Sequence, residues 1–200
     1  MTVGRAFRVT VYASSSERID AAYFPPAEEL GRRLAENGYE LVFGGGRYGL
    51  MGAVSRGARK AGGQIRGVIL QQFIDKNVHC EETEPMESVT DMRTRKRGLD
   101  EAGDAYVALP GGLGTLEEVL EILSFKQLGF HQKPVVLLNT RGYWDPLIAM
   151  LERGFDQGFV QPHFRGIYTV AYDPESAIEQ IRNPVPWHGA ARDERGGGTA

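Results

Sequence analysis

The sequence has too little cysteine for a disulfide and no histidine pattern that suits a metal. Cys80 is the single cysteine among 200 residues, so no disulfide can form within the chain and a reducing compartment fits. The four histidines show no metal-ligand spacing, and one cysteine is too few for most structural zinc sites. We therefore expect no bound metal.

The sequence also lacks a long apolar run and an excess of positive charge. No apolar run approaches the roughly 20 residues of a membrane span, and the segment 1–8 lacks the apolar centre of a signal peptide. The formal net charge is -3, whereas a general nucleic-acid binder usually has a basic domain. These absences predict a cytoplasmic protein whose partner is neither a membrane nor a nucleic acid.

Short apolar runs alternate with segments of helical period through most of the chain. We expect strands over 7–13, 39–43, 65–70, 105–109, 134–139 and 167–172. We expect helices over about 20–37, 49–61, 90–102, from 115 onward, 144–154 and 174–181. Because the strands are apolar on both faces, this order predicts an α/β fold, a doubly wound, Rossmann-like parallel sheet covered by helices on both sides.

Three segments modify this alternation. Pro25 and Pro26 are expected to lie in the first turn of the helix 20–37 or to break it into two pieces. Residues 71–90 form an acidic loop that could enclose a short strand. From 183 onward the apolar period is lost, so we predict a single domain over 1–182 and a disordered tail over 183–200.

A glycine-rich turn follows the expected strand 105–109 and precedes an apolar stripe at helical spacing. Gly111, Gly112 and Gly114 let the backbone come close to a bound group, because no Cβ stands in the way. The free N–H groups and the positive dipole end of the next helix favour an anion there. Thr115 could cap that helix and still offer its hydroxyl. The turn therefore predicts a phosphate site.

The same segment has a second interpretation. Thr115, with Glu118 three residues later, fits the capping box, in which the two side chains satisfy each other's backbone N–H groups. On that interpretation the helix starts after Thr115, and the only role of Glu118 is to cap the N-terminus of that helix. The local pattern leaves both roles of Glu118 open.

One face of the expected helix 90–102 carries an arginine among apolar residues: Met92, Arg95, Leu99 and Ala102. We expect this face to point inward, so Arg95 needs an anionic partner. Thr90 is the expected N-cap of the helix, and Lys96 is expected to form a surface pair with Asp100. The apolar stripe thus singles out Arg95 as a candidate functional residue.

A second glycine turn follows the expected strand 39–43. Gly44, Gly46 and Gly49 fit the dinucleotide fingerprint, which also requires an acidic residue at the end of the next strand. Here that strand runs into two glutamines, so an NAD site is disfavoured. The turn is expected either to line the same cleft as the first glycine turn or to allow close helix–strand packing.

Taken together, these motifs resemble the Lonely Guy (LOG) family, the cytokinin riboside 5'-monophosphate phosphoribohydrolases. The family joins an Arg-Lys pair on one helix to P-G-G-x-G-T-x-x-E on the next strand-to-helix turn. Here Arg95 and Lys96 precede a matching segment, 110–118, and Glu118 follows Arg95 by 23 residues as in the family. The resemblance extends over about residues 7–182.

Two positions depart from the family pattern. Arg93 stands where the family commonly has histidine, and Asn77 stands where a substrate-contacting glutamate is expected. These departures bear on which base is accepted more than on the chemistry.

The resemblance implies hydrolysis of the N-glycosidic bond of an adenosine 5'-monophosphate, giving a free base and ribose 5-phosphate, in a homodimer that needs no cofactor. Arg95 and Glu118 are then the catalytic residues, with Glu118 facing an oxocarbenium-like transition state. The implied substrate-binding residues are Lys96, Gly111, Gly112, Leu113, Gly114, Thr115, Leu116 and Glu117.

The rival interpretation is a nucleotide or molybdenum-cofactor carrier on the same fold, which binds without turnover. Arg95 together with Glu118 favours the enzyme, because a pure phosphate binder has little use for a carboxylate near its anion. A pyridoxal enzyme built on a lysine has no support, since Lys126 and Lys133 are expected at the surface or at a strand edge.

Overall fold

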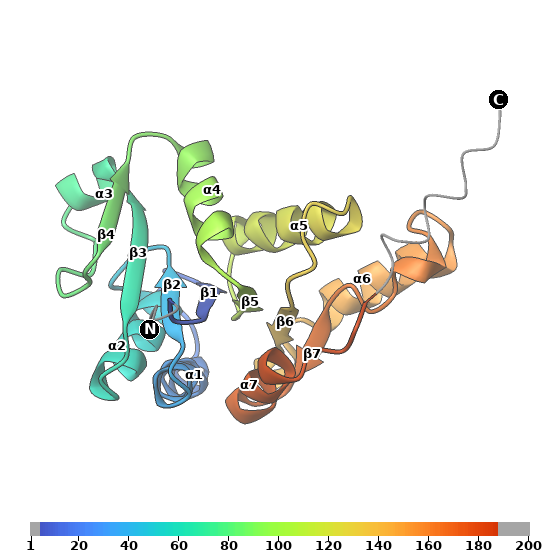
Figure 1. Ribbon diagram of the computed structural model, residues 1–200, viewed down its shortest axis with the longest axis horizontal. Helices are drawn as coiled ribbons and strands as arrows, with labels where there is room; N and C mark the ends of the chain where they lie inside the picture. Colours follow the sequence, from blue (N-terminus) through green and yellow to red (C-terminus); the bar gives the residue numbers. More distant parts are fainter. Residues whose placement is uncertain (1–4, 188–200) are drawn as a thin grey trace.

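Seven parallel strands form one sheet in the computed structural model, which describes residues 5–187. The strands are β1 (Arg8–Tyr12), β2 (Glu40–Phe43), β3 (Ile65–Leu70), β4 (Met86–Val89), β5 (Ala105–Ala108), β6 (Val135–Leu138) and β7 (Thr169–Ala171). Their order across the sheet is β4-β3-β2-β1-β5-β6-β7 (Figure 1). The parallel sheet predicted from the sequence is confirmed.

Helices cover both faces of this sheet. They are α1 (Phe24–Glu36), α2 (Gly49–Lys60), α3 (Gln71–Asp75), α4 (Met92–Ala102), α5 (Leu113–Gln127), α6 (Asp145–Asp156) and α7 (Pro174–Arg182), with short 3-10 turns η1 (Ala21–Tyr23), η2 (Thr140–Gly142) and η3 (Pro162–Phe164). One face is covered by α1, α2 and α7, and the other by α4, α5 and α6 (Figure 1). The fold is therefore doubly wound.

Each face of the sheet has its own apolar core. Every residue of β2, β5 and β6 is buried, as expected of strands sandwiched between helices. On one side Leu30 and Leu34, one helical turn apart, bury α1 against the sheet. On the other side Leu99 and Val119 do the same for α4 and α5. Burial of such side chains, worth about 1.5–3 kcal/mol each, fixes both helix layers.

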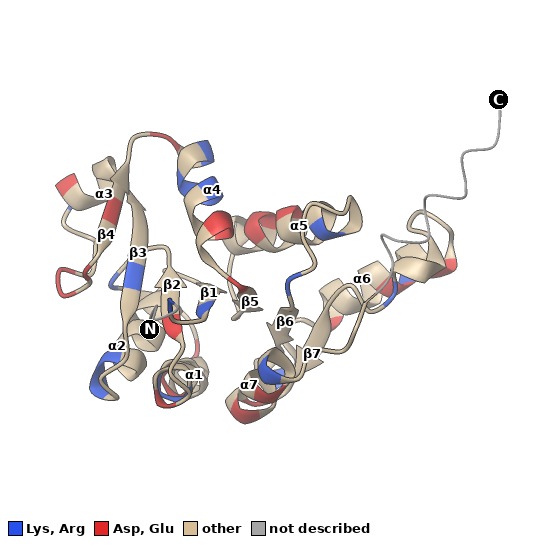
Figure 2. Cartoon of the chain, viewed as in Figure 1, with Lys and Arg blue, Asp and Glu red and all other residues tan. Residues whose placement is uncertain are grey.

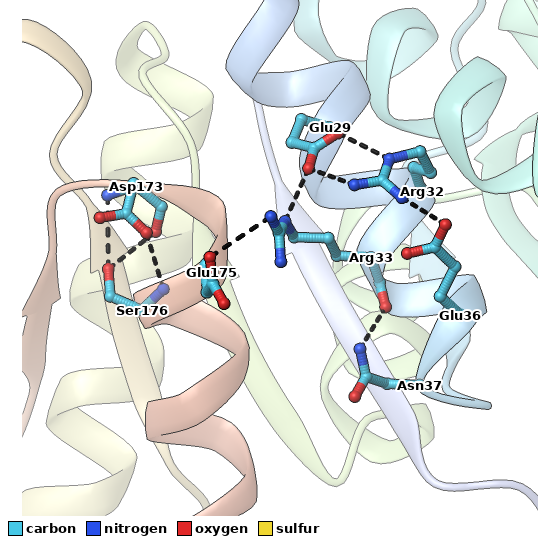
Figure 3. Close-up of polar contacts among 8 residues, drawn as sticks. All are labelled: Glu29, Arg32, Arg33, Glu36, Asn37, Asp173, Glu175 and Ser176. Atoms are coloured by element: carbon cyan, nitrogen blue, oxygen red, sulfur yellow. Dashed lines mark hydrogen bonds and ion pairs between the residues drawn. The ribbon is translucent and has the colours of Figure 1, made fainter.

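The first and last helices are joined by polar contacts as well as by the core. Figure 3 shows Arg33 of α1 donating from Nε to Glu29 at 2.6 Å and reaching Glu175 of α7 at 3.4 Å. The helix α7 starts with a capping box between Asp173 and Ser176. These contacts hold α7 beside α1 on one face of the sheet.

Several helix boundaries differ from the sequence expectations. Pro25 and Pro26 occupy the first turn of α1, as expected. The expected helix 20–37 is also divided into two pieces, η1 and α1. Asp91, and not Thr90, caps α4, because its carboxylate accepts from the backbone N of Arg93 and of Thr94 at 3.0 Å. The expected acidic loop contains the short strand β4, but α3 was not predicted.

The sheet order places two loops side by side at its middle. From β1 the chain proceeds toward one edge, β2 to β4, and from β5 toward the other, so the strand order reverses between β1 and β5. Doubly wound sheets bind their ligands outside the carboxyl ends of the strands at such a reversal. The backbone N of Ser14, after β1, donates to the carbonyl of Pro110, after β5, at 3.1 Å. The glycine turn 111–115 therefore lies at the position where such folds bind ligands.

Within residues 5–187, no helix has the length and apolar character needed to cross a bilayer. Helix α7 ends at Arg182, and residues 188–200 of the predicted tail lie outside the described part of the chain.

Candidate active site

Arg95 is buried at the carboxyl edge of the sheet with three acceptors around its guanidinium. Nε donates to the carbonyl of Val68 and Nη2 to the carbonyl of Gly44, both at 3.2 Å. Nη1 reaches Oε1 of Glu118 on α5 at 3.4 Å. The anionic partner that the apolar stripe required is thus Glu118, as the family pattern implied.

Gly44 explains why the second glycine turn lies beside this arginine. A Cβ at that position would stand 2.2 Å from Nη2 of Arg95, so only glycine leaves room for the guanidinium. Gly49, at the other end of the turn, has a φ of +60° and packs against the carbonyl of Ser14. The turn therefore packs closely against Arg95 at one glycine and against the loop after β1 at another. The carbonyl groups of Gly44 and Val68 left no mark in the sequence, because every residue has one.

Glu118 is largely but not fully buried beside Arg95, and this burial raises the pKa of its carboxyl group. Its side chain is 13% exposed, and this desolvation raises the pKa of Glu118 to about 7 although the Arg95 guanidinium acts in the opposite direction. A carboxyl that titrates near neutral pH can serve as carboxylate or as acid, and that property is common at catalytic sites.

The capping box proposed for Thr115 and Glu118 is wrong. The N-cap of helix α5 is Gly112, three residues before Thr115. Gly112 has an extended conformation, and no side chain forms a cap hydrogen bond. Thr115 is therefore buried inside the first turn, where it packs against Gly111. Glu118 lies in the second turn, beyond reach of the helix end, and its carboxylate is available to Arg95.

Lys96 also bridges α4 and α5, in a pair that the sequence did not predict. Its Nζ donates to Glu117 at 2.6 Å and to Glu121 at 3.1 Å, and not to Asp100. Asp100 instead accepts the hydroxyl of Tyr106. The spacing of four residues along one helix could not show that α5 brings carboxylates closer. In Figure 2 the ribbon of α4 carries basic residues and the ribbon of α5 beside it carries acidic ones.

The glycines of the turn 111–115 differ in what surrounds them. A Cβ on Gly111 would lie 2.1 Å from Oγ1 of Thr115, so internal packing requires that glycine. Gly112 and Gly114 are exposed, and a Cβ on either would meet nothing within 4 Å. Leu113 between them is 86% exposed, whereas Leu116 is half-buried. The turn therefore presents open backbone at a helix N-terminus, the arrangement that favours a bound anion.

Two further side chains, Met92 and Lys126, lie differently from the sequence expectations, whereas Lys133 lies close to the start of β6, as expected of a strand-edge residue. Met92 was expected inside but is 44% exposed, because α4 is only starting there. Lys126 was expected at the surface but is buried in α5 under Trp187, and burial lowers the pKa of Lys126 to about 8. Lys133 is half-buried and donates to the Tyr106 hydroxyl at 3.0 Å. Neither lysine has a contact with Arg95 or Glu118.

The two departures from the family pattern lie on exposed backbone. Arg93 is exposed in the first turn of α4. Asn77 has a φ of +53° just after α3, a conformation that asparagine tolerates better than glutamate does. The structure thus gives a backbone reason for asparagine at that position. Within residues 5–187, no group of three or more His, Cys, Asp or Glu residues is placed to hold a metal ion.

Comparison with known proteins extends these observations. Residues 51–181 match the family model described as "possible lysine decarboxylase". The chain is 39% identical over 181 residues to a probable cytokinin riboside 5'-monophosphate phosphoribohydrolase of rice (Oryza sativa subsp. japonica), LOGL2, covering 90% of this chain and 74% of that protein. It is 37% identical over 185 residues to the Arabidopsis thaliana enzyme LOG7, covering 92% and 85%. The chain belongs to the Lonely Guy (LOG) family.

Solved structures with the same fold include carriers. A molybdenum cofactor binding protein from Rippkaea orientalis superposes with a TM-score of 0.69 at 26% identity, over 90% of this LOG-family chain and 97% of that protein. The molybdenum cofactor carrier protein of Chlamydomonas reinhardtii gives the same TM-score at 24% identity, which supports the fold alone. The fold is thus shared between LOG enzymes and carriers, and the site must distinguish them.

Proposed function

We propose that this LOG-family protein hydrolyses the N-glycosidic bond of a cytokinin riboside 5'-monophosphate or of AMP, releasing the free base and ribose 5-phosphate. The observation that carries the proposal is the buried ion pair between Arg95 and Glu118 beside an open glycine turn. The phosphoribohydrolases of rice and Arabidopsis, similar over most of their length, support it.

The open turn is the proposed phosphate site. Gly112 and Gly114 leave their backbone uncovered, and the start of α5 offers N–H groups and the positive dipole end to an anion. A 5'-phosphate held there would place the ribose toward the second turn of α5, where Glu118 lies. Charge-assisted contacts of this kind are strong, so the phosphate should contribute much of the binding energy.

The two carboxylates in the second turn of α5 have different proposed roles. Glu118, buried and tied to Arg95, faces the positive charge that develops on the ribose as the bond to the base breaks, and it orients the attacking water. Arg95 holds that carboxylate in place and stabilises the departing base. Glu117, exposed and bound by Lys96, is placed to bind ribose hydroxyls. No metal or organic cofactor enters this scheme.

A carrier that binds the nucleotide without turnover is the second candidate, because molybdenum cofactor proteins share the fold. A carrier of an anionic ligand gains nothing from a buried carboxylate close to that ligand, since the two charges repel each other. The buried position of Glu118 therefore favours the enzyme.

We further propose a homodimer that acts in the cytoplasm. Large apolar side chains are exposed on α5 and α6 and just after each of these helices, an arrangement that suits a second copy: Leu113, Leu120, Leu128, Met150 and Phe159. Cys80 is a free, buried thiol, as suits a reducing compartment. Light scattering should give about twice the chain mass of 22.1 kDa. A fully active monomer would contradict the dimer.

The proposed function is tested by incubating the protein with AMP and with isopentenyladenosine monophosphate and measuring free base by chromatography. We expect base release from at least one of them and far slower release from the matching nucleoside. Tight binding of AMP with no free base would instead support the carrier.

A further inference from the structure

Tyr143 lies in the corner between η2 and α6, and it is not among the site residues expected from the sequence. Its hydroxyl donates to the carbonyl oxygen of Gly111 at 2.5 Å. The loop after β6 is thus hydrogen-bonded to the first residue of the glycine turn 111–115. The Tyr143 ring packs edge-on against Tyr23 and Trp144, with centroids 6.2 and 5.1 Å away. The hydroxyl is thus held in place from both sides.

The corner that carries Tyr143 is itself fixed by side-chain hydrogen bonds. The backbone N of Trp144 donates to Oδ1 of Asn139 at 2.7 Å, and Nδ2 of Asn139 donates to Asp145 at 2.7 Å. Nε1 of Trp144 donates to the carbonyl of Ala108, at the end of β5, at 3.2 Å. The corner therefore clamps β5 and the turn that follows it.

These contacts set the direction of the backbone N–H groups in the turn. In a trans peptide the C=O of one residue and the N–H of the next point in opposite directions. Ser14 binds the carbonyl of Pro110, which directs the N–H of Gly111 away from Ser14. In the same way, Tyr143 binds the carbonyl of Gly111 and thereby directs the N–H of Gly112 away from Tyr143.

We propose that Tyr143 is a positioning residue for the 5'-phosphate. By holding the carbonyl of Gly111, its hydroxyl keeps that oxygen from turning toward the anion and presents the N–H of Gly112 to it. Without the hydroxyl, the peptide between Gly111 and Gly112 can rotate, because both of its residues are glycines. The inference rests on the proposed function for the identity of the ligand, a ribose 5-phosphate monoester.

The test is Tyr143→Phe, which removes only the hydroxyl. We expect the Kd for ribose 5-phosphate and the KM for AMP to rise about tenfold, with kcat changed less than twofold. The inhibition constant of adenosine, which lacks the phosphate, should stay unchanged. Tyr172→Phe removes a hydroxyl from an exposed tyrosine after β7, and this control variant should match wild type in all three measurements.

The readouts separate this inference from the proposed function. If the wild type releases no base from AMP, the proposed function fails, while ribose 5-phosphate affinity still tests Tyr143. An unchanged Kd for ribose 5-phosphate in Tyr143→Phe, or an equal loss of adenosine and phosphate affinity, overturns the inference. If the variant does not fold, the amide resonance of Gly112 in the wild type decides: it should shift on adding ribose 5-phosphate, and no shift overturns the inference.

Discussion

The two glycine turns of this protein use the same residue for different purposes. In the turn after β2, a Cβ on Gly44 would collide with Arg95, and Gly49 has a φ of +60° against the Ser14 carbonyl. In the turn after β5, a Cβ on Gly112 or Gly114 would meet nothing. Internal packing therefore explains the glycines Gly44 and Gly49. At Gly112 and Gly114, by contrast, the space that a side chain would occupy is left open.

This difference shows why glycine spacing alone is weak evidence for a nucleotide site. The turn 44–49 matches the dinucleotide fingerprint, yet Gly44 is explained by an arginine and Gly49 by a neighbouring loop. The turn 111–115 lacks that fingerprint, yet it is the one with open backbone. A glycine is required by packing when an added Cβ would collide with protein atoms. A glycine can face a ligand when an added Cβ would point into open space.

The largest expected effect comes from breaking the ion pair between Arg95 on α4, beside the first turn, and Glu118 on α5, the helix that follows the second turn. Glu118→Gln keeps the shape but removes the charge, so kcat for base release should fall at least ~100-fold while AMP still binds. Calorimetry and a base-release assay measure the two quantities. Glu121→Gln, at another α5 carboxylate bound to a lysine, is the matched control and should retain most activity. Wild-type turnover in Glu118→Gln would rule out a catalytic Glu118.

A glycine required by packing should not tolerate substitution, even though it touches no substrate. In Gly44→Ala the new Cβ would lie 2.2 Å from Nη2 of Arg95, so the guanidinium must leave its position and its hydrogen bond to the Gly44 carbonyl is disturbed. We expect kcat to fall by about 10- to 100-fold and stability to drop by about 1–3 kcal/mol. Thermal melts and kinetics on the same preparation check this. An active, stable variant would show that the position of Arg95 is adjustable.

The pH dependence should reveal the burial of Glu118. Since the carboxylate is the proposed active form, kcat/KM should decrease below an apparent pKa near 7, by about tenfold from pH 8 to pH 6. Because that pKa is raised above the ordinary value of 4.5, the stability linked to it is present below pH 4.5 and is lost as pH rises to about 7.

Chemical denaturation across pH 4–8 measures this stability change against the Glu118→Gln variant. The wild type should lose up to roughly 3 kcal/mol more than the variant between pH 4.5 and 7. Parallel curves for the two proteins would mean that Glu118 titrates normally.

The smallest expected effect is at a ligand-facing glycine. Gly114→Ala adds a methyl group where nothing stands within 4 Å, so the fold should keep or gain up to about 1 kcal/mol of stability. The KM for AMP should nevertheless rise about fivefold, because the methyl group occupies phosphate space. If KM stays at the wild-type value, the opening at Gly114 does not hold the phosphate.

The features that could be predicted from the sequence are those set by the spacing of apolar residues and by the energetic cost of burying an unpaired charge. The strands and the long helices followed from periodicity, and the apolar stripe showed that Arg95 needs an anionic partner. The family resemblance, and not periodicity, pointed to Glu118, which is the partner found. Sequence reasoning failed where contacts cross between elements. Lys96 binds carboxylates of a neighbouring helix, and Lys126 is covered by Trp187 from far along the chain. It also misplaced the start of α5, because an extended Gly112 competes with Thr115 as N-cap.

The paired contacts between α4 and α5 also limit where this chain can change in length. Arg95 and Lys96 reach Glu118 and Glu117 across a segment that contains β5, a buried strand. An insertion between 103 and 112 would shift the strand register or the turn, and would separate both pairs together. An insertion in the connection 128–134, beyond α5, leaves both pairs intact. Natural and engineered length variants of the domain should therefore accumulate in the second segment and be absent from the first.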